Sequence, residues 1–455
     1  MSSSKIDLSF IEEYVKNGEI EKEKLKKNLN IKVNSKEYYD ILKYEKHHIN
    51  YHSVRKLGLF RSVIFQCGNL VCFSPTKSLN ESQFFETNSF KNIVLETYVE
   101  GTMINCFYNK KKREWMISTK TIMHADKTYC KDIQITFRKM FFDAFDEQKL
   151  SWNMFDRSYC YSFVLQHPDN KIVLPIEKPA LYLVEVYKIN GFTVERMDFK
   201  NMECFSSILE QVNVAKEIHI GDMSMDEIKL KYASSNACYD NVGIMFKQKE
   251  GFERYKIRNP VYEYLHKLKG NNPKLQYQYY SLRKNNKVKE FLLHFPSYKE
   301  HFSVLRSELH KTTVQLWKNY ISCFVKHVQP LEKYSYQFRP HMIALHEMYL
   351  NELREKNRHI SRQLVINYIS NLEVPRLMYL VNFPIKERNL KEKQMIFNKL
   401  QEEKNRILQN DESKKENDTE TNKQTIGDKI KKYNNRKLPP PPRNPPNNRP
   451  PPSKQ

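Results

Sequence analysis

Two basic side chains alternate within the stretch 255–258 and could bind phosphate together. Lys256 and Arg258 are separated by one residue, and residues spaced in this way on a strand point to the same face. An ammonium and a guanidinium group on one face suit the oxygens of a phosphate, to which both donate charge-assisted hydrogen bonds. The spacing therefore predicts a phosphate-binding pair, although a solvated strand face is the commoner fate of such residues.

A second candidate is the basic, tyrosine-rich segment that follows this pair. Lysine and arginine bind phosphates, and aromatic rings stack on unpaired bases, so the combination is typical of single-stranded or loop RNA recognition. A charged domain surface explains the same composition equally well. The residues predicted to contact RNA are Lys267, Lys274, Tyr277, Tyr279, Arg283, Lys284, Lys287 and Lys289.

Three histidines lie close together near the N-terminus, at His47, His48 and His52. Zinc sites use imidazole nitrogens, often from histidines at i and i+4 of a helix or beside carboxylates. Only His48 and His52 have that spacing, and no carboxylate pattern surrounds the three histidines. We therefore interpret them as surface residues and predict no metal site.

The overall charge favours a polyanionic partner. The chain has 455 residues, with 76 Lys+Arg against 53 Asp+Glu and a formal net charge of +23. Such a protein most often meets nucleic acid, and no apolar run suggests a membrane partner. Glycine is scarce, at 10 residues. The chain has no Gly-rich phosphate loop, which argues against a P-loop ATPase, a Rossmann dehydrogenase and a protein kinase.

The elements that must position these residues indicate an α+β fold. Residues 58–270 contain strand-like runs without steady βαβ alternation, which predicts antiparallel sheets with flanking helices. Residues 103–119 are expected to form a hairpin. The predicted strands are Ser62–Phe65, Asn69–Phe73, Ile93–Val99, Thr102–Tyr108, Trp115–Thr119, Tyr161–Gln166, Leu181–Ile189 and Val242–Lys247.

The regions on either side of this domain differ in pattern. Residues 1–57 are predicted to be a helical, basic segment, with an amphipathic helix over 5–17. Residues 271–410 show helical spacing and predict an all-helical domain. Residues 411–455 are polar and then proline-rich, which predicts a disordered basic tail that could also dock a proline-reading partner. Prolines expected to mark helix starts or connections are Pro340, Pro375 and Pro384.

Several stretches occur in the order and spacing of a known family. The sequence Tyr98-Val99-Glu100-Gly101-Thr102 resembles the nucleophile motif K-x-D/E-G-S/T of covalent nucleotidyltransferases, and Arg61 and Lys77 lie in segments that resemble its lead-in. Residues 161–173 resemble the third motif, 241–246 the fourth and 255–266 the fifth. The chain thus resembles the phage-type RNA ligases over residues 58–266. It resembles more closely the RNA-ligase-like proteins of large cytoplasmic DNA viruses, such as African swine fever virus.

The resemblance implies ligation through a lysyl-nucleotide, with ATP and Mg as cofactors if the protein is active. The nucleophilic lysine, however, is replaced by Tyr98, and the glutamates expected in the third and fourth motifs are Gln166 and Val242. A phenol is a poor substitute for the amine, and neutral side chains cannot hold a hard cation. Glu100, Arg61, Lys77, Lys256 and Arg258 remain, and the four cations among them could still bind phosphate.

We therefore predict an RNA-ligase-like nucleotidyltransferase-fold protein that is degenerate and retains binding to tRNA or viral RNA. The sequence does not decide whether any enzymatic activity survives. The alternative is a non-enzymatic structural or nucleic-acid-binding protein packaged in a virion. The resemblance implies a location in the virion and in the host cytoplasm.

Overall fold

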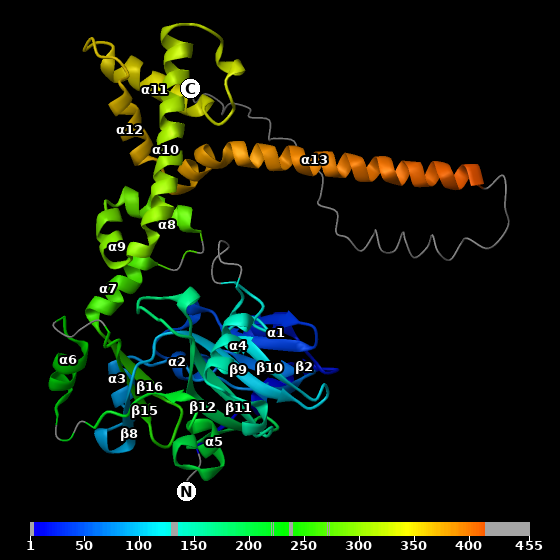
Figure 1. The fold of residues 1–455 in the computed structure, drawn as a ribbon. Helices are drawn as coiled ribbons and strands as arrows, with labels where there is room; N and C mark the ends of the chain where they lie inside the picture. The colour runs from blue at the N-terminus through cyan, green and yellow to red at the C-terminus, as the bar shows by residue number, and fades with distance from the viewer. Residues whose placement is uncertain are drawn as a thin grey trace. The chain divides into compact units, whose positions relative to one another are not determined.

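The computed structural model describes residues 4–128, 135–219, 221, 223–235, 240–270, 272 and 274–414. The chain divides into two compact units, Met1–Met378 and Tyr379–Gln455. The first contains antiparallel sheets with flanking helices and then a run of helices (Figure 1), which confirms the predicted α+β class.

The largest sheet has the strand order β1-β13-β12-β11-β9-β10, with the short β14 parallel to β12. Alternate residues of its strands face helix α4 (Phe137–Glu147), where Phe141 packs with Phe163 in a buried core. The predicted hairpin is present as β9 and β10, with Asn109 opposite Glu114. The strands are β1 (Lys5–Asp7), β9 (Thr102–Asn109), β10 (Glu114–Thr119), β11 (Tyr159–Gln166), β12 (Ala180–Asn190), β13 (Thr193–Met197) and β14 (Asn213–Val214).

A three-stranded sheet carries the residues of the candidate site. Its order is β16 (Arg254–Arg258), β15 (Gly243–Gln248) and β8 (Ile93–Thr97), and both pairings are antiparallel. Ile244 and Phe246 of β15 are fully buried against Leu95 and Phe84. Helices α3 (Glu81–Phe85) and α6 (Met225–Ala233) pack on this sheet.

The N-terminal region is not the predicted helical segment. Residues 5–17 form β1, a 3₁₀ helix (Ser9–Tyr14) and β2. Ile6 pairs with Val194 across β13, so tertiary strand pairing overrides the helical spacing of the apolar residues. A four-stranded sheet of order β4-β5-β6-β7 crosses the predicted boundary at residue 57, because Ile41 pairs with Ile64. The remaining N-terminal elements are β2 (Val15–Lys16), β3 (Glu19–Ile20), α1 (Lys22–Leu29), β4 (Ile31–Lys36), β5 (Tyr39–Tyr44), α2 (Val54–Leu57), β6 (Val63–Gln66) and β7 (Asn69–Cys72).

The predicted helical region follows β16. Pro340 and Pro375 lie in the first turns of α11 and α13, as predicted, but Pro384 lies inside α13 and marks no boundary. No helix in the described part of the chain is long and apolar enough to cross a membrane. The helices are α5 (Ser206–Leu209), α7 (Pro260–Lys269), α8 (Leu275–Lys284), α9 (Val288–His294), α10 (Lys299–Tyr320), α11 (Arg339–Met348), α12 (Arg362–Asn371) and α13 (Val374–Lys414).

Only the first four residues of the tail predicted over 411–455 are among the described residues. Residues 411–414 complete helix α13, so the helical pattern extends slightly past the predicted start of the tail. Residues 415–455, including the proline-rich stretch, lie outside the described residues.

Candidate functional site

Tyr98 lies directly after β8, at the end of the three-stranded sheet. Its backbone N–H donates to the Gly243 carbonyl of β15 at 2.9 Å. The Arg258 guanidinium donates to the Tyr98 hydroxyl at 3.1 Å, with its Cζ 5.2 Å from the ring centroid, and the Lys256 ammonium lies 5.4 Å from the same centroid. The alternation of Lys256 and Arg258 thus places both cations on Tyr98, as the strand spacing predicts.

The positive charges around Tyr98 change its acidity. Burial alone raises the pKa of the phenol, but Lys256, Arg258 and Arg61 together outweigh burial and lower that pKa below its ordinary value. Burial also lowers the pKa of Arg61 to about 10. The Tyr98 hydroxyl thus accepts a hydrogen bond from Arg258, and Lys256 and Arg61 add further positive charge around it.

Lys120, just after β10, adds to this charge. Its ammonium lies 4.8 Å from the centroid of the Tyr44 ring. Burial and the nearby charges of Arg61, Lys46, Lys43 and Lys256 lower its pKa to about 8. We call Arg61, Lys120 and Lys256 the basic cluster. Within the described residues no carboxylate lies at ion-pair distance from any of its three members, whereas Arg258 pairs with Glu263 at 2.9 Å.

The cavity beside Tyr98 is small. It has a volume of about 80 Å³, whereas sites for small molecules and cofactors usually measure about 300–1,000 Å³. The lining residues include Arg61, Tyr98, Ser162, Val164, Met245, Lys247 and Arg254.

The carboxylate that lines this cavity is held by lysines. Glu96 accepts from Lys200 at 2.6 Å and from Lys247 at 2.8 Å, and Lys247 also pairs with Glu185 at 3.0 Å. Glu185 in turn pairs with Arg196 at 3.2 Å. Burial raises the pKa of Glu96, but the two lysines outweigh it and lower that pKa. Two ammonium groups thus neutralise the carboxylate that could otherwise hold a divalent cation, and a cavity of this volume does not admit ATP.

Gln166 and Val242, the two positions at which the resemblance leads us to expect glutamates, lie in different surroundings. Gln166 is part of β11, and its amide donates to the Glu100 backbone carbonyl at 2.8 Å. Val164, two residues earlier on the same strand, lines the cavity together with Ser162. Val242 is buried just before β15. The sequence did not single out Val164, because only the cavity shows which part of the strand faces Tyr98.

Glu100 and Gly101 have structural roles in this arrangement. The Glu100 carboxylate accepts from the backbone N–H groups of Val173 and Leu174, each at 3.1 Å at its shortest, and it is almost fully buried. Gly101 has φ +152°, and a Cβ there would lie 2.5 Å from the Leu165 carbonyl oxygen. The chain can therefore approach β11 only with glycine at this position. Lys77 does not line the cavity, and its ammonium donates to the Ser78 carbonyl at 3.3 Å.

Comparisons with known proteins give distant matches to RNA ligases. No family model matches the chain. An RNA ligase of Rhodothermus phage RM378 is 22% identical over 201 residues, which are 38% of this chain and 45% of the phage protein. Two solved structures of Naegleria gruberi RNA ligase, a variant with ATP and Mn and the ligase with PPi, are each 10% identical, cover 43% of this chain and 58% of theirs, and have TM-scores of 0.33 and 0.32. The chain thus spans about half the length of these relatives.

The predicted RNA-contacting residues lie on helices α7–α9 and the segments between them (Figure 1). Tyr279 is 4% exposed and packs on Phe302 at 5.0 Å, so it cannot stack on a base, and its prediction is wrong. Tyr277 is half-buried. The cations Arg283, Lys284 and Lys287 are bonded to Ser370, Glu373 and Glu290, respectively, and Lys267, Lys274 and Lys289 are exposed.

Proposed function

We propose that this protein binds RNA through an RNA-ligase-like nucleotidyltransferase fold and does not form the lysyl-nucleotide of active ligases. The observation that carries the proposal is the environment of Tyr98. A phenol stands where the family has its nucleophilic amine, and it is surrounded by cations, of which Lys256 and Arg61 have no carboxylate partner among the described residues. These cations suit phosphate oxygens, and the site provides no amine at the nucleophile position.

The RNA partner is supported by the charge distribution. The net charge of +23 favours a polyanion, and the basic cluster concentrates part of it at one place in the fold. Of the cations predicted on α7–α9 and nearby, several already have partners within the protein. The basic cluster is therefore the better candidate for the principal phosphate contacts, with the exposed lysines of α7–α9 as secondary ones.

We expect no covalent nucleotide adduct on incubation of the protein with α-labelled ATP and Mg. The reason is that Tyr98 replaces the amine and that the adjoining cavity is too small for a nucleotide. Denaturing electrophoresis should show no labelled band. A phosphoramidate on Lys120 or a phosphodiester on Tyr98 would give a band that disappears in Lys120→Ala or Tyr98→Phe, respectively, and either result would overturn this part of the proposal.

RNA binding should depend on the basic cluster. Replacing Lys120 and Lys256 together with glutamine should weaken binding to single-stranded RNA, because each charge releases counterions from phosphate. The plot of log affinity against log salt should become shallower by roughly 0.7 for each phosphate that the protein no longer neutralises. Filter binding over a salt series measures both quantities.

The matched control for this experiment lies on α1. Lys26 and Lys27 are exposed, so Lys26→Gln with Lys27→Gln removes the same charge away from Tyr98. This control should retain the affinity and salt dependence of the unchanged protein. An equal loss of RNA affinity in the two double variants would mean that only the total charge of the protein matters. The proposed RNA-binding role of the basic cluster would then be wrong.

We further propose, on the sequence resemblance alone, that the protein belongs to a large cytoplasmic DNA virus and is carried in its particles. Mass spectrometry of purified particles tests this. Absence of the protein from particles, with abundance in infected cytoplasm, would remove the packaging role and leave the RNA-binding proposal intact.

A further inference from the structure

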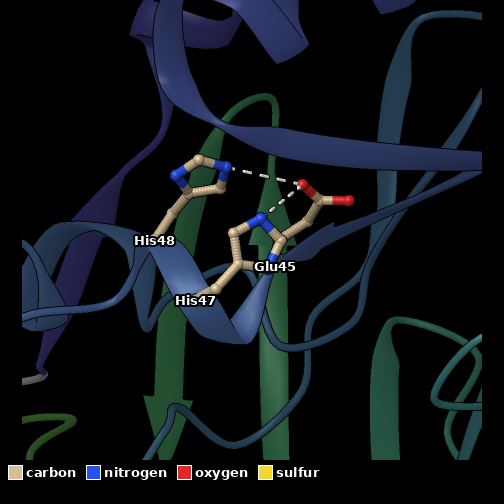
Figure 2. A group of neighbouring side chains, drawn as sticks. All are labelled: Glu45, His47 and His48. Atoms are coloured by element: carbon tan, nitrogen blue, oxygen red, sulfur yellow. Dashed lines mark ion pairs between the residues drawn. The ribbon is translucent and has the colours of Figure 1, made fainter. Parts of the chain in front are cut away.

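A short turn after β5 brings two imidazoles to one carboxylate. The 3₁₀ turn Lys46–His48 follows Glu45, and Figure 2 shows both histidine rings directed at the same Glu45 oxygen. The His47 Nε2 atom lies 3.5 Å and the His48 Nε2 atom 3.6 Å from Glu45 Oε2. All three ligand atoms lie within 4.8 Å of one another. The sequence pattern did not predict this group, because a carboxylate two residues before His47 matches neither helical spacing nor a known zinc motif.

The separations suit a small transition-metal ion. Zinc binds imidazole nitrogen and carboxylate oxygen at about 2.0–2.1 Å, which in a tetrahedral site puts neighbouring ligand atoms about 3.4 Å apart. The two oxygen–nitrogen separations of 3.5 and 3.6 Å already agree with that value. The two imidazole nitrogens lie no more than 4.8 Å apart and would have to approach each other when an ion binds. Imidazole with carboxylate is a donor set that suits zinc and its neighbours better than magnesium.

Exposure and charge allow an ion to reach this group. The side chains of His47 and His48 are 71% and 38% exposed, and that of Glu45 is 22% exposed. The Lys43 ammonium lies within electrostatic reach of Glu45, and Lys46 is in the same turn, so neighbouring positive charge opposes the binding of a cation. This opposition favours a site of modest affinity and an exchangeable ion over a buried structural one.

We propose that Glu45, His47 and His48 form a three-ligand site for a zinc-class divalent ion, with a fourth position open to water or a phosphate oxygen. The site is independent of the proposed RNA binding. Its ligands come from one turn beside β5, the strand that ends in Tyr44, on whose ring Lys120 lies. A bound ion would therefore add positive charge on the flank of the basic cluster.

The test is metal binding by the full chain after removal of adventitious ions with a chelator. Isothermal titration with Zn²⁺ and absorption titration with Co²⁺ should show one more equivalent bound by the unchanged protein than by the double variant His47→Ala, His48→Ala. Each single change should weaken that equivalent at least about tenfold, since a direct ligand matters no less than the outer-shell groups whose loss has such effects. Circular dichroism should show unchanged folding, because the histidines are exposed.

His52 supplies the matched control. It is an exposed histidine of the same segment and is not part of the ligand group. His52→Ala should keep the full stoichiometry and affinity. If the double variant binds as many ions as tightly as the unchanged protein, the three side chains form ion pairs only and the site does not exist. If His52→Ala loses the equivalent as well, the assignment to these three ligands is wrong.

Discussion

Replacing Lys247 with methionine is expected to lower the free energy of unfolding by about 3–5 kcal/mol, the range found when one partner of a buried ion pair is removed. The Lys247 side chain is 8% exposed and bonds to both Glu96 and Glu185, which are 7% and 6% exposed. Methionine has a similar volume, but without Lys247 the two buried carboxylates keep only Lys200 and Arg196 as charged partners. The large loss comes from those charges and not from a cavity.

The loss of stability caused by Lys247→Met should decrease as the pH falls. In the unchanged protein Lys247 helps to hold the pKa values of Glu96 and Glu185 below 4.5, so their contribution to stability is present above that pH and is lost as pH falls through the lowered values. In the variant, protonation removes the charge of the two carboxylates and with it the energetic cost of burying them. The difference in stability between the two proteins should therefore be largest near neutral pH and should shrink in acid.

Urea denaturation at neutral and acidic pH measures this difference. The control is Lys139→Met, because Lys139 forms an exposed pair with Asp143 on α4 and its removal should change stability little. A Lys247 variant as stable as the unchanged protein at neutral pH would show that the network is not needed for folding. A deficit that stays constant in acid would assign the loss to packing.

Replacing Gly243 with alanine should cost about 3 kcal/mol or more, since backbone strain and overpacking each cost about 1–3 kcal/mol and here they act together. Gly243 has φ +137°, and a Cβ there would lie 2.1 Å from the Ile257 carbonyl oxygen and 2.8 Å from the Arg258 Cα atom. The Gly243 carbonyl also accepts from Tyr98, so the shift of β15 from β16 should separate Arg258 from the phenol.

Gly191 provides the control for this substitution. It also has a positive φ, of +59°, but within the described part of the chain no neighbouring atom lies within 4 Å of the point that a Cβ would occupy. Gly191→Ala should therefore cost only about 1 kcal/mol, the penalty of the left-handed conformation alone. Thermal or urea unfolding of both variants measures the difference. Similar losses for Gly191→Ala and Gly243→Ala would show that the close approach of the two strands is not the cause.

Local pattern predicted the strands of the core well. The predicted runs 102–108 and 115–119 agree within one residue with β9 and β10, because both runs are rich in β-branched and aromatic residues and flank a polar segment. The same reasoning failed at 5–17, where the apolar spacing suits a helix but residues 5–7 pair with β13. Pairing with a strand so distant in sequence leaves no local signal.

The sequence by itself determined which side chains the candidate site contains. It shows the phenol of Tyr98, the neutral residues Gln166 and Val242, and two cations, Lys256 and Arg258, that must share a strand face. Only the tertiary structure decided which charges have carboxylate partners, because ion pairing depends on distances between strands far apart in the chain. It paired Lys284 with Glu373, buried Tyr279 and left Lys120 beside Arg61 and Lys256. It also set Glu45 between His47 and His48, since the conformation of a turn, and not its composition, fixes where three neighbouring side chains point.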